Sequence, residues 1–222
     1  MTRPSPRVMA AHASSYCHKH GWRRGGKPPF NPVIMAALGK IVLQGWAEAS
    51  TGRLHYPPVI STKSYLVAMH EIGHMMHEHT NAYDSPAWHM LAIEAEATGW
   101  ARDHMLEGAW DTPVQRFARH QLQRGLDTCL DFVAKLGMPL DAFLPPAEHR
   151  FWSLLGTTRA VLLTEHEAED NGTELTLGDF EDIAMILLQH QHEHPEIEPE
   201  QTAYESWLVF ENHKLEDMSY KI

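Results

Sequence analysis

The segment MHEIGHMMHEH, residues 69–79, constrains the fold of this chain more than any other stretch. It carries four histidines and two glutamates within eleven residues. The residues around it are mostly apolar and recur at helical spacing, which predicts an apolar helix from about Ser64 to Glu78. Imidazoles and carboxylates buried in such a helix are costly unless they have partners. The fold must therefore supply those partners.

Residues His70 to His74 match the motif H-E-x-x-H. Residues four apart lie on one face of a helix, so both imidazoles can bind a single zinc ion. Glu71 then stands near the position that water occupies in a catalytic zinc site, where it can act as general base. We therefore predict His70 and His74 as zinc ligands and Glu71 as the catalytic residue. The alternative, a buried histidine pair that binds no metal, is kept open.

A catalytic zinc ion usually has three protein ligands and one open position. In the pattern H-E-x-x-H-x-x-G-x-x-H the third ligand is a histidine, but this chain has His77 at the glycine and Thr80 at the last histidine. A glutamate on the next helix is a better candidate for the third ligand. An Asp-Ser-Pro sequence predicts the start of that helix, which spans about 84–106. That helix contains two candidates, Glu94 and Glu96.

Glu94 and Glu96 point about 200° apart on a helix, so only one of them should face the metal. Glu94 lies in an apolar stripe, where an unpaired carboxylate would be costly. Thr98 follows Glu94 by one turn and offers a hydroxyl that can hold a metal ligand in place, whereas Trp100 follows Glu96. We therefore predict Glu94 as the third ligand and keep Glu96 in reserve. The stripe consists of Met90, Leu91, Ala97, Thr98 and Ala101.

The two helices together resemble the gluzincin arrangement, in which an H-E-x-x-H helix is followed by a helix that bears a glutamate ligand. HEIGH followed by E-x-E-A-x-x-W-A is similar to the ImmA/IrrE-type metallopeptidases, whose pattern is approximately HELGH followed by E-x-E-A-N-x-F-A. The nineteen residues between His74 and Glu94 are similar to the gap in thermolysin-like peptidases. Thr98 stands where the ImmA/IrrE family has Asn, and Trp100 where it has Phe. The resemblance covers residues 60–106.

This resemblance implies a small zincin domain with a short sheet and an active-site helix. It implies Zn2+ as the cofactor, with His70, His74 and Glu94 as ligands and Glu71 as general base. Members of the family are intracellular peptidases that cleave regulators, such as phage, mobile-element or DNA-damage-response repressors. They often work beside a DNA-binding partner, so a regulatory protein partner is expected here as well.

The patterns along the chain predict a mainly α fold of the α+β, zincin-like kind, with a small sheet before residue 62. Three segments are expected: a basic, flexible arm at 1–31, a zincin-like metallopeptidase core at 32–140 and a helical extension packed on that core at 141–222. The prolines of TGRLHYPPVIS confine any strand there to a sheet edge. Helices besides the two above are predicted at about 32–50, 111–136, 146–166, 177–192 and 199–216.

Charge is distributed unevenly along the chain. Residues 1–47 contain seven Lys/Arg and no Asp or Glu, which leaves 11 of the 18 basic residues in the remainder against all 29 acidic ones. A body that acidic repels phosphate backbones. Nucleic acid is therefore not expected as a direct ligand.

Composition also bears on location. No apolar run approaches the roughly 20 residues that a membrane span needs. The N-terminal segment lacks an apolar stretch long enough for a secretory signal, and two cysteines form no disulfide framework. We expect a cytoplasmic protein that binds no membrane.

Several polar residues near the motif remain without an assigned role. His77 and His79 follow the motif directly, and we expect them to be solvated at the end of the helix, with a place at the rim of the site as the alternative. A peptidase also needs a group that stabilises the developing oxyanion. The sequence does not rank the candidates for that role, which are His89, His104, Tyr65 and Tyr83.

The leading functional hypothesis is a zinc metallopeptidase of the gluzincin type. It would hydrolyse a peptide bond in an intracellular protein substrate, such as a regulator or repressor. The alternative is a zincin-like protein-binding or antirepressor module, with structural zinc or none, that performs no catalysis. The intact Glu71 favours the first hypothesis, because a structural zinc ion needs no general base.

Overall fold

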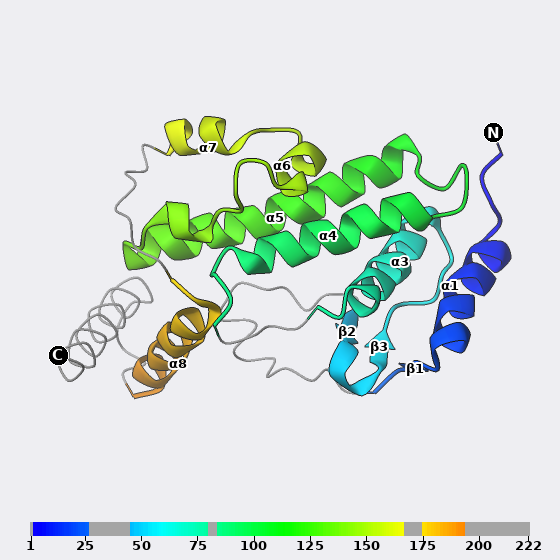
Figure 1. Cartoon of the computed structure of the whole chain (residues 1–222), viewed down its shortest axis with the longest axis horizontal. Helices are drawn as coiled ribbons and strands as arrows, with labels where there is room; N and C mark the ends of the chain where they lie inside the picture. Colours follow the sequence, from blue (N-terminus) through cyan, green and yellow to red (C-terminus); the bar gives the residue numbers. More distant parts are fainter. Residues whose placement is uncertain (1, 27–44, 80–83, 167–174, 194–222) are drawn as a thin grey trace.

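The computed structural model describes residues 2–26, 45–79, 84–166 and 175–193. This part of the chain is mainly helical and has one small three-stranded sheet near its N-terminal end, as predicted. Figure 1 shows the sheet near the N-terminal helix, at one end of the molecule, and two long helices that lie side by side above it. None of the described helices is both long enough and apolar enough to cross a membrane.

Three short strands form the sheet: β1 (Arg23–Arg24), β2 (Trp46–Glu48) and β3 (Arg53–His55). Their order is β1-β3-β2, with β1 parallel and β2 antiparallel to β3. A short 3-10 turn, η1 (Ala49–Thr51), joins β2 to β3. It ends at Gly52, whose φ of 63° is a conformation that residues with a side chain rarely adopt.

β3 is the central strand, so the expectation of an edge strand in this segment is wrong. Pro57 and Pro58 lie just beyond the last paired residue of β3, His55. Because the ladder ends before the prolines, their missing N–H groups remove no hydrogen bond from the sheet.

The helix predicted at 32–50 is wrong at its C-terminal end, because residues 46–48 form β2. Pairing with β3 and burial of Trp46, which is 6% exposed, stabilise the extended conformation. Tertiary contacts of this kind commonly override a local helical preference. The part of this prediction before Gly45 lies outside the described residues.

Helix α3 (Thr62–Met76) carries the H-E-x-x-H motif and agrees closely with the predicted helix. Ser61 and Ser64 form a reciprocal capping box at its start. Its apolar face is buried, with Tyr65 and Met69 fully enclosed. The helix contacts strands β2 and β3 as well as several helices, so the motif lies between the sheet and the helical part of the molecule.

Residues Pro6–His20 form helix α1, so the expectation of a flexible N-terminal arm is wrong for this segment. Ser5 caps its first turn and Gly21 ends it in the left-handed region. Met9 and Ala13, one turn apart, are buried in the same cluster as α3. The apolar stripe is so narrow, and its neighbours so polar, that its periodicity is weak in the sequence.

Helices α4 (His89–His104) and α5 (Thr112–Leu136) form the long antiparallel hairpin of Figure 1. The bounds of α5 confirm the helix predicted at 111–136. Asp111 caps its start by accepting a hydrogen bond from Val114 N, and Gly137 ends it with a φ of 62°. α4 begins a few residues later than the prediction of about 84–106.

Gly73 lets α3 and α4 approach closely. A Cβ atom at Gly73 would lie 2.8 Å from the carbonyl oxygen and 3.0 Å from the Cα of Ala97 in α4. Real Cβ atoms essentially never come within 3.0 Å of another heavy atom of this kind. The distance between the two helices therefore depends on the absence of a side chain at Gly73.

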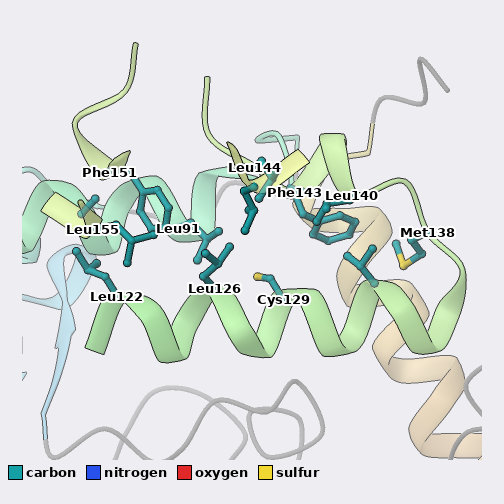
Figure 2. Close-up of a cluster of buried hydrophobic side chains, with 14 of the residues drawn as sticks. Leu91, Leu122, Leu126, Cys129, Met138, Leu140, Phe143, Leu144, Phe151 and Leu155 are labelled. Carbon is teal, nitrogen blue, oxygen red and sulfur yellow. The ribbon is translucent and has the colours of Figure 1, made fainter. Parts of the chain in front are cut away.

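A second hydrophobic cluster lies toward the open end of the hairpin, away from the loop that joins α4 to α5. Figure 2 shows Leu122, Leu126 and Cys129 on one face of α5, pointing toward Leu91 of α4. Further residues of the cluster come from the 3-10 turn η2 (Leu140–Phe143) and from the segment that follows it. They include Leu144, Phe151 and Leu155, all labelled in Figure 2.

The helix predicted at 146–166 is divided into α6 (Arg150–Leu155) and α7 (Arg159–Glu165). Gly156 separates them, with a φ of 84° that no helix continues through. Thr158 then caps α7 by accepting a hydrogen bond from Val161 N.

The last described helix, α8 (Leu177–Glu193), agrees with its prediction, whereas the helix predicted at 199–216 lies outside the described residues. Ile183 of α8 joins the second hydrophobic cluster, which runs from Ala87 to Ile183. The boundary expected at residue 140, between the core and the helical extension, therefore falls inside one continuous hydrophobic cluster.

Candidate metal centre

Helices α3 and α4 bring the three predicted ligands together. His70 Nε2 lies 3.1 Å from Glu94 Oε2 and 3.0 Å from His74 Nε2. His74 Nε2 lies 3.7 Å from Glu94 Oε1. The side chains are largely enclosed, with exposed fractions of 16% for His70, 12% for His74 and 31% for Glu94.

These separations can be compared with those of a tetrahedral zinc site. Zinc–nitrogen and zinc–oxygen bonds of about 2.0–2.1 Å place neighbouring ligand atoms about 3.3 Å apart. The three distances in this cluster fall on both sides of that value. Two imidazole nitrogens and a carboxylate oxygen are also donors that zinc prefers. His70, His74 and Glu94 are therefore positioned to bind a metal ion.

The remaining nitrogen of His70 faces α4. His70 Nδ1 lies 3.2 Å from the hydroxyl oxygen of Thr98, whose residue is 5% exposed. A proton on Nδ1 can be donated to that oxygen, which leaves Nε2 free to bind a metal. The sequence predicts that Thr98 offers a hydroxyl that holds a metal ligand in place, and in the structure this hydroxyl lies beside His70.

Glu71 lies beside the cluster and is 3% exposed. Burial raises the pKa of its carboxyl to about 8, against the lowering effect of His70 and with a further increase from the charge of Glu94. An ideal Cβ at Gly45, just before β2, would lie 2.5 Å from Glu71 Oε1. The backbone at Gly45 therefore encloses the Glu71 carboxyl.

His70 itself has a shifted pKa. Burial lowers the pKa of the imidazole, but the hydrogen bond and the charge of Glu94, together with the charge of Glu71, raise it above its ordinary value. The same two carboxyl groups that stabilise a proton on His70 would also stabilise a metal cation in its place.

Glu96 belongs to a different group of side chains. His79 Nε2 lies 2.8 Å from Glu96 Oε2, and His77 completes a second set with metal-ligating spacing. Because Glu94 and Glu96 point to different sides of α4, Glu94 alone joins His70 and His74. The geometry thus agrees with the choice of Glu94 over Glu96, while ligation itself stays a prediction.

The expectation that His79 is solvated is wrong, although His77 is exposed as expected. The His79 side chain is 7% exposed, and its Nδ1 lies 2.9 Å from His74 Nδ1. Burial lowers the pKa of His79, against the raising effect of Glu96. The sequence signal for this contact is weak, because His79 follows the end of α3 and its direction depends on one backbone angle at Glu78.

Two of the four candidates for stabilising an oxyanion are occupied elsewhere. The Tyr65 hydroxyl lies 2.6 Å from His12 Nδ1 and accepts a hydrogen bond from Leu106 N. His104 stacks on Trp100, ten residues and about 15 Å along α4 from Glu94. His89 lies near enough to His79 to lower its pKa, and Tyr83 lies outside the described residues.

No protein-family model, curated protein or solved structure matches this chain in the comparisons that we made. The likeness to ImmA/IrrE-type metallopeptidases therefore rests on the residues of α3 and α4. Membership of that family stays a prediction.

Proposed function

We propose that this protein is a zinc-dependent hydrolase that cleaves a peptide bond in a protein substrate. The observation that supports the proposal is the convergence of His70 Nε2, His74 Nε2 and a Glu94 carboxylate beside the carboxyl of Glu71. In such a site zinc supplies Lewis acidity, which polarises a carbonyl group and makes a water molecule more acidic. The residue-level resemblance to gluzincins points to the same chemistry.

In this proposal Glu71 takes a proton from the attacking water and later delivers it to the leaving amine. That role requires the ionised carboxylate, and a nearby positive charge lowers the pKa of a buried carboxyl group. The raised pKa of about 8 in the metal-free protein is therefore compatible with a base that becomes ionised once the site is loaded. His70, His74 and Glu94 would hold the metal throughout.

The sheet offers a way to hold a peptide. β2 is an outer strand of the described sheet, and the backbone at Gly45, just before it, lies so near the Glu71 carboxyl that no Cβ would fit between them. An extended segment that pairs with an outer strand gains main-chain hydrogen bonds independent of its sequence. A peptide paired along β2 would pass close to Glu71. The resemblance extends the proposal to an intracellular regulator, such as a repressor, as substrate.

One observation favours the alternative, a protein-binding or antirepressor module without catalysis. Glu71 is 3% exposed and Gly45 lies against its carboxyl, so a water molecule has little access to it in this conformation. In that alternative the metal, if bound, holds α3 and α4 together, and the surface around them binds a partner.

Zinc content tests the metal site first. We expect about one zinc per chain in the purified protein after loading with excess zinc, from the three-ligand set. His74→Ala and Glu94→Ala should lose it. Glu96→Ala, the matched change two residues along α4, removes no ligand and should still hold about one zinc at this excess, even where its affinity is lower. An unmutated protein without zinc, or a loss that follows Glu96 instead of Glu94, would contradict the site.

Glu71→Gln tests catalysis separately. The variant should retain zinc but lose hydrolysis, measured as new amino termini released from a mixture of unfolded proteins. Removal of a general base typically costs 100-fold or more in rate. If the zinc-loaded protein releases no new termini, or if Glu71→Gln releases them at the same rate, the binding-module alternative is favoured.

A further inference from the structure

We propose that His79 and Glu96 form a supporting pair that orients the metal ligand His74 and determines which of its ring nitrogens carries the proton. This inference rests on the metal site proposed above. It assigns a role to two residues that lie outside the H-E-x-x-H motif and are not themselves proposed as ligands of this metal.

The pair forms an uninterrupted chain of contacts that begins at His74. His74 Nδ1 lies 2.9 Å from His79 Nδ1, and His79 Nε2 lies 2.8 Å from Glu96 Oε2. Both are hydrogen-bond distances. The chain runs from the end of α3 to the middle of α4, and it starts from the ring nitrogen of His74 that does not contact His70.

The positions of the protons along this chain follow from metal binding. A neutral histidine that binds a metal through Nε2 carries its proton on Nδ1. His74 Nδ1–H must then donate, and His79 Nδ1 is the atom that accepts. His79 consequently carries its own proton on Nε2, where it donates to the Glu96 carboxylate. Every donor in the chain meets an acceptor.

The second oxygen of Glu96 faces His149. His149 Nε2 lies 3.7 Å from Glu96 Oε1, and His149 Nδ1 accepts a hydrogen bond from Phe151 N at 3.1 Å. The neutral form of His149 therefore presents an Nε2 proton toward Glu96. Glu96 thus lies between His79, at hydrogen-bond distance, and His149, the residue that caps α6, at an ion-pair distance.

The backbone after α3 is bent in a way that brings His79 to His74. Glu78 has a φ of 51°, and it is the one non-glycine residue with positive φ among those the structure describes. Residues with a side chain rarely adopt this conformation. It turns the chain back, so that His79 N donates to His74 O at 3.1 Å and the His79 ring meets the His74 ring.

The same residues suggest a competing role, a second metal site formed by His77, His79 and Glu96. A metal on His79 Nε2 would place the His79 proton on Nδ1, facing His74 Nδ1. The His74 proton would then lie on Nε2, which excludes His74 as a ligand. With neutral imidazoles the two sites are mutually exclusive. Because His77 is exposed while His70 and His74 are enclosed, we assign the metal to His70, His74 and Glu94.

The test compares two substitutions at His79 in the full-length protein. His79→Phe keeps a ring of similar size but removes the acceptor, whereas His79→Asn places a carbonyl oxygen near the position of Nδ1. Zinc affinity is measured by competition with a chromophoric chelator. We expect His79→Phe to weaken zinc binding about 10- to 100-fold, as for other residues that support a metal ligand, and His79→Asn to recover most of the loss.

A second readout separates orientation from general destabilisation. The absorption bands of the Co2+-substituted protein depend on ligand geometry, so His79→Phe should shift them while His79→Asn should resemble the unmutated protein. Glu96→Gln, which keeps an acceptor oxygen, should weaken zinc binding less than Glu96→Ala. Glu78→Gly, which permits the same backbone conformation, should leave zinc affinity and the Co2+ spectrum unchanged.

The outcomes distinguish this inference from the proposed function. If the unmutated protein binds no zinc, the metal site fails and the supporting pair fails with it. If it binds one zinc but His79→Phe has the same affinity and Co2+ spectrum, the supporting pair alone is overturned. Two zinc ions bound together with comparable affinity would also overturn it, because the proton positions exclude simultaneous occupation.

Discussion

The Glu71 carboxyl links the candidate site to the stability of the metal-free protein. Its pKa rises from an ordinary value of 4.5 to about 8 on folding, mainly because of burial. Between these two values the folded state retains a proton that the unfolded state releases. The free energy of unfolding therefore decreases as the pH rises from about 4.5 to 8.

Glu71→Gln should remove this pH dependence, because glutamine has nearly the same shape and no proton to lose. In the presence of a chelator, we expect the variant to be more stable than the unmutated protein at pH 8, by on the order of a few kcal/mol. At pH 5 the difference should be small. Urea unfolding at the two pH values measures it, and an equal difference at both would contradict the assignment to Glu71.

At the scale of whole elements, the contact between α3 and α4 determines whether the three proposed ligands meet. His70 and His74 lie on one helix and Glu94 on the other, so a change in the distance between the helices changes the ligand separations directly. Gly73 sets this distance through its contact with Ala97.

Gly73→Ala should destabilise the protein by about 1–3 kcal/mol, as overpacking of a core does, although alanine favours the helical conformation. It should also weaken zinc binding. Gly125→Ala in α5 is the matched control, because its Cβ would meet Leu91 at an ordinary 3.6 Å. Thermal unfolding and chelator competition measure the two effects. A Gly73→Ala variant as stable and as zinc-binding as Gly125→Ala would contradict the role of this contact.

At the scale of the whole molecule, metal binding and folding should be coupled, because the ligands come from two elements that meet only in the folded state. A ligand that binds the folded state alone stabilises it by about 4 kcal/mol at a free concentration 1,000 times its dissociation constant. The shift should be larger at pH 8 than at pH 5, since a cation also offsets the cost of ionising Glu71.

Calorimetry with and without zinc tests this coupling. We expect the melting temperature of the unmutated protein to rise with zinc concentration and that of His74→Ala to stay constant. An equal rise in both would mean that zinc stabilises the protein through other residues, such as the exposed His77.

Much of the helical framework can be predicted from sequence alone, because its signals are local. Helix α5 begins after the capping residue Asp111 and ends at Gly137, and both ends follow from residue type. The apolar period around the motif likewise predicts α3. The angular offset between Glu94 and Glu96 on one helix already indicated that only one would face His70 and His74, and the stripe around Glu94 indicated which.

What the sequence determined by itself was therefore the helix periods, the caps and the side of α4 on which each glutamate lies, all set by residues a few positions apart. Only the tertiary structure decided that Trp46–Glu48 extends as β2, that Met9 and Ala13 pack as α1 and that His79 reaches His74. Each of these depends on a partner that is distant in sequence or on a single backbone angle. The periodic pattern of apolar residues does not predict such contacts, because they stabilise the fold only after the elements have come together.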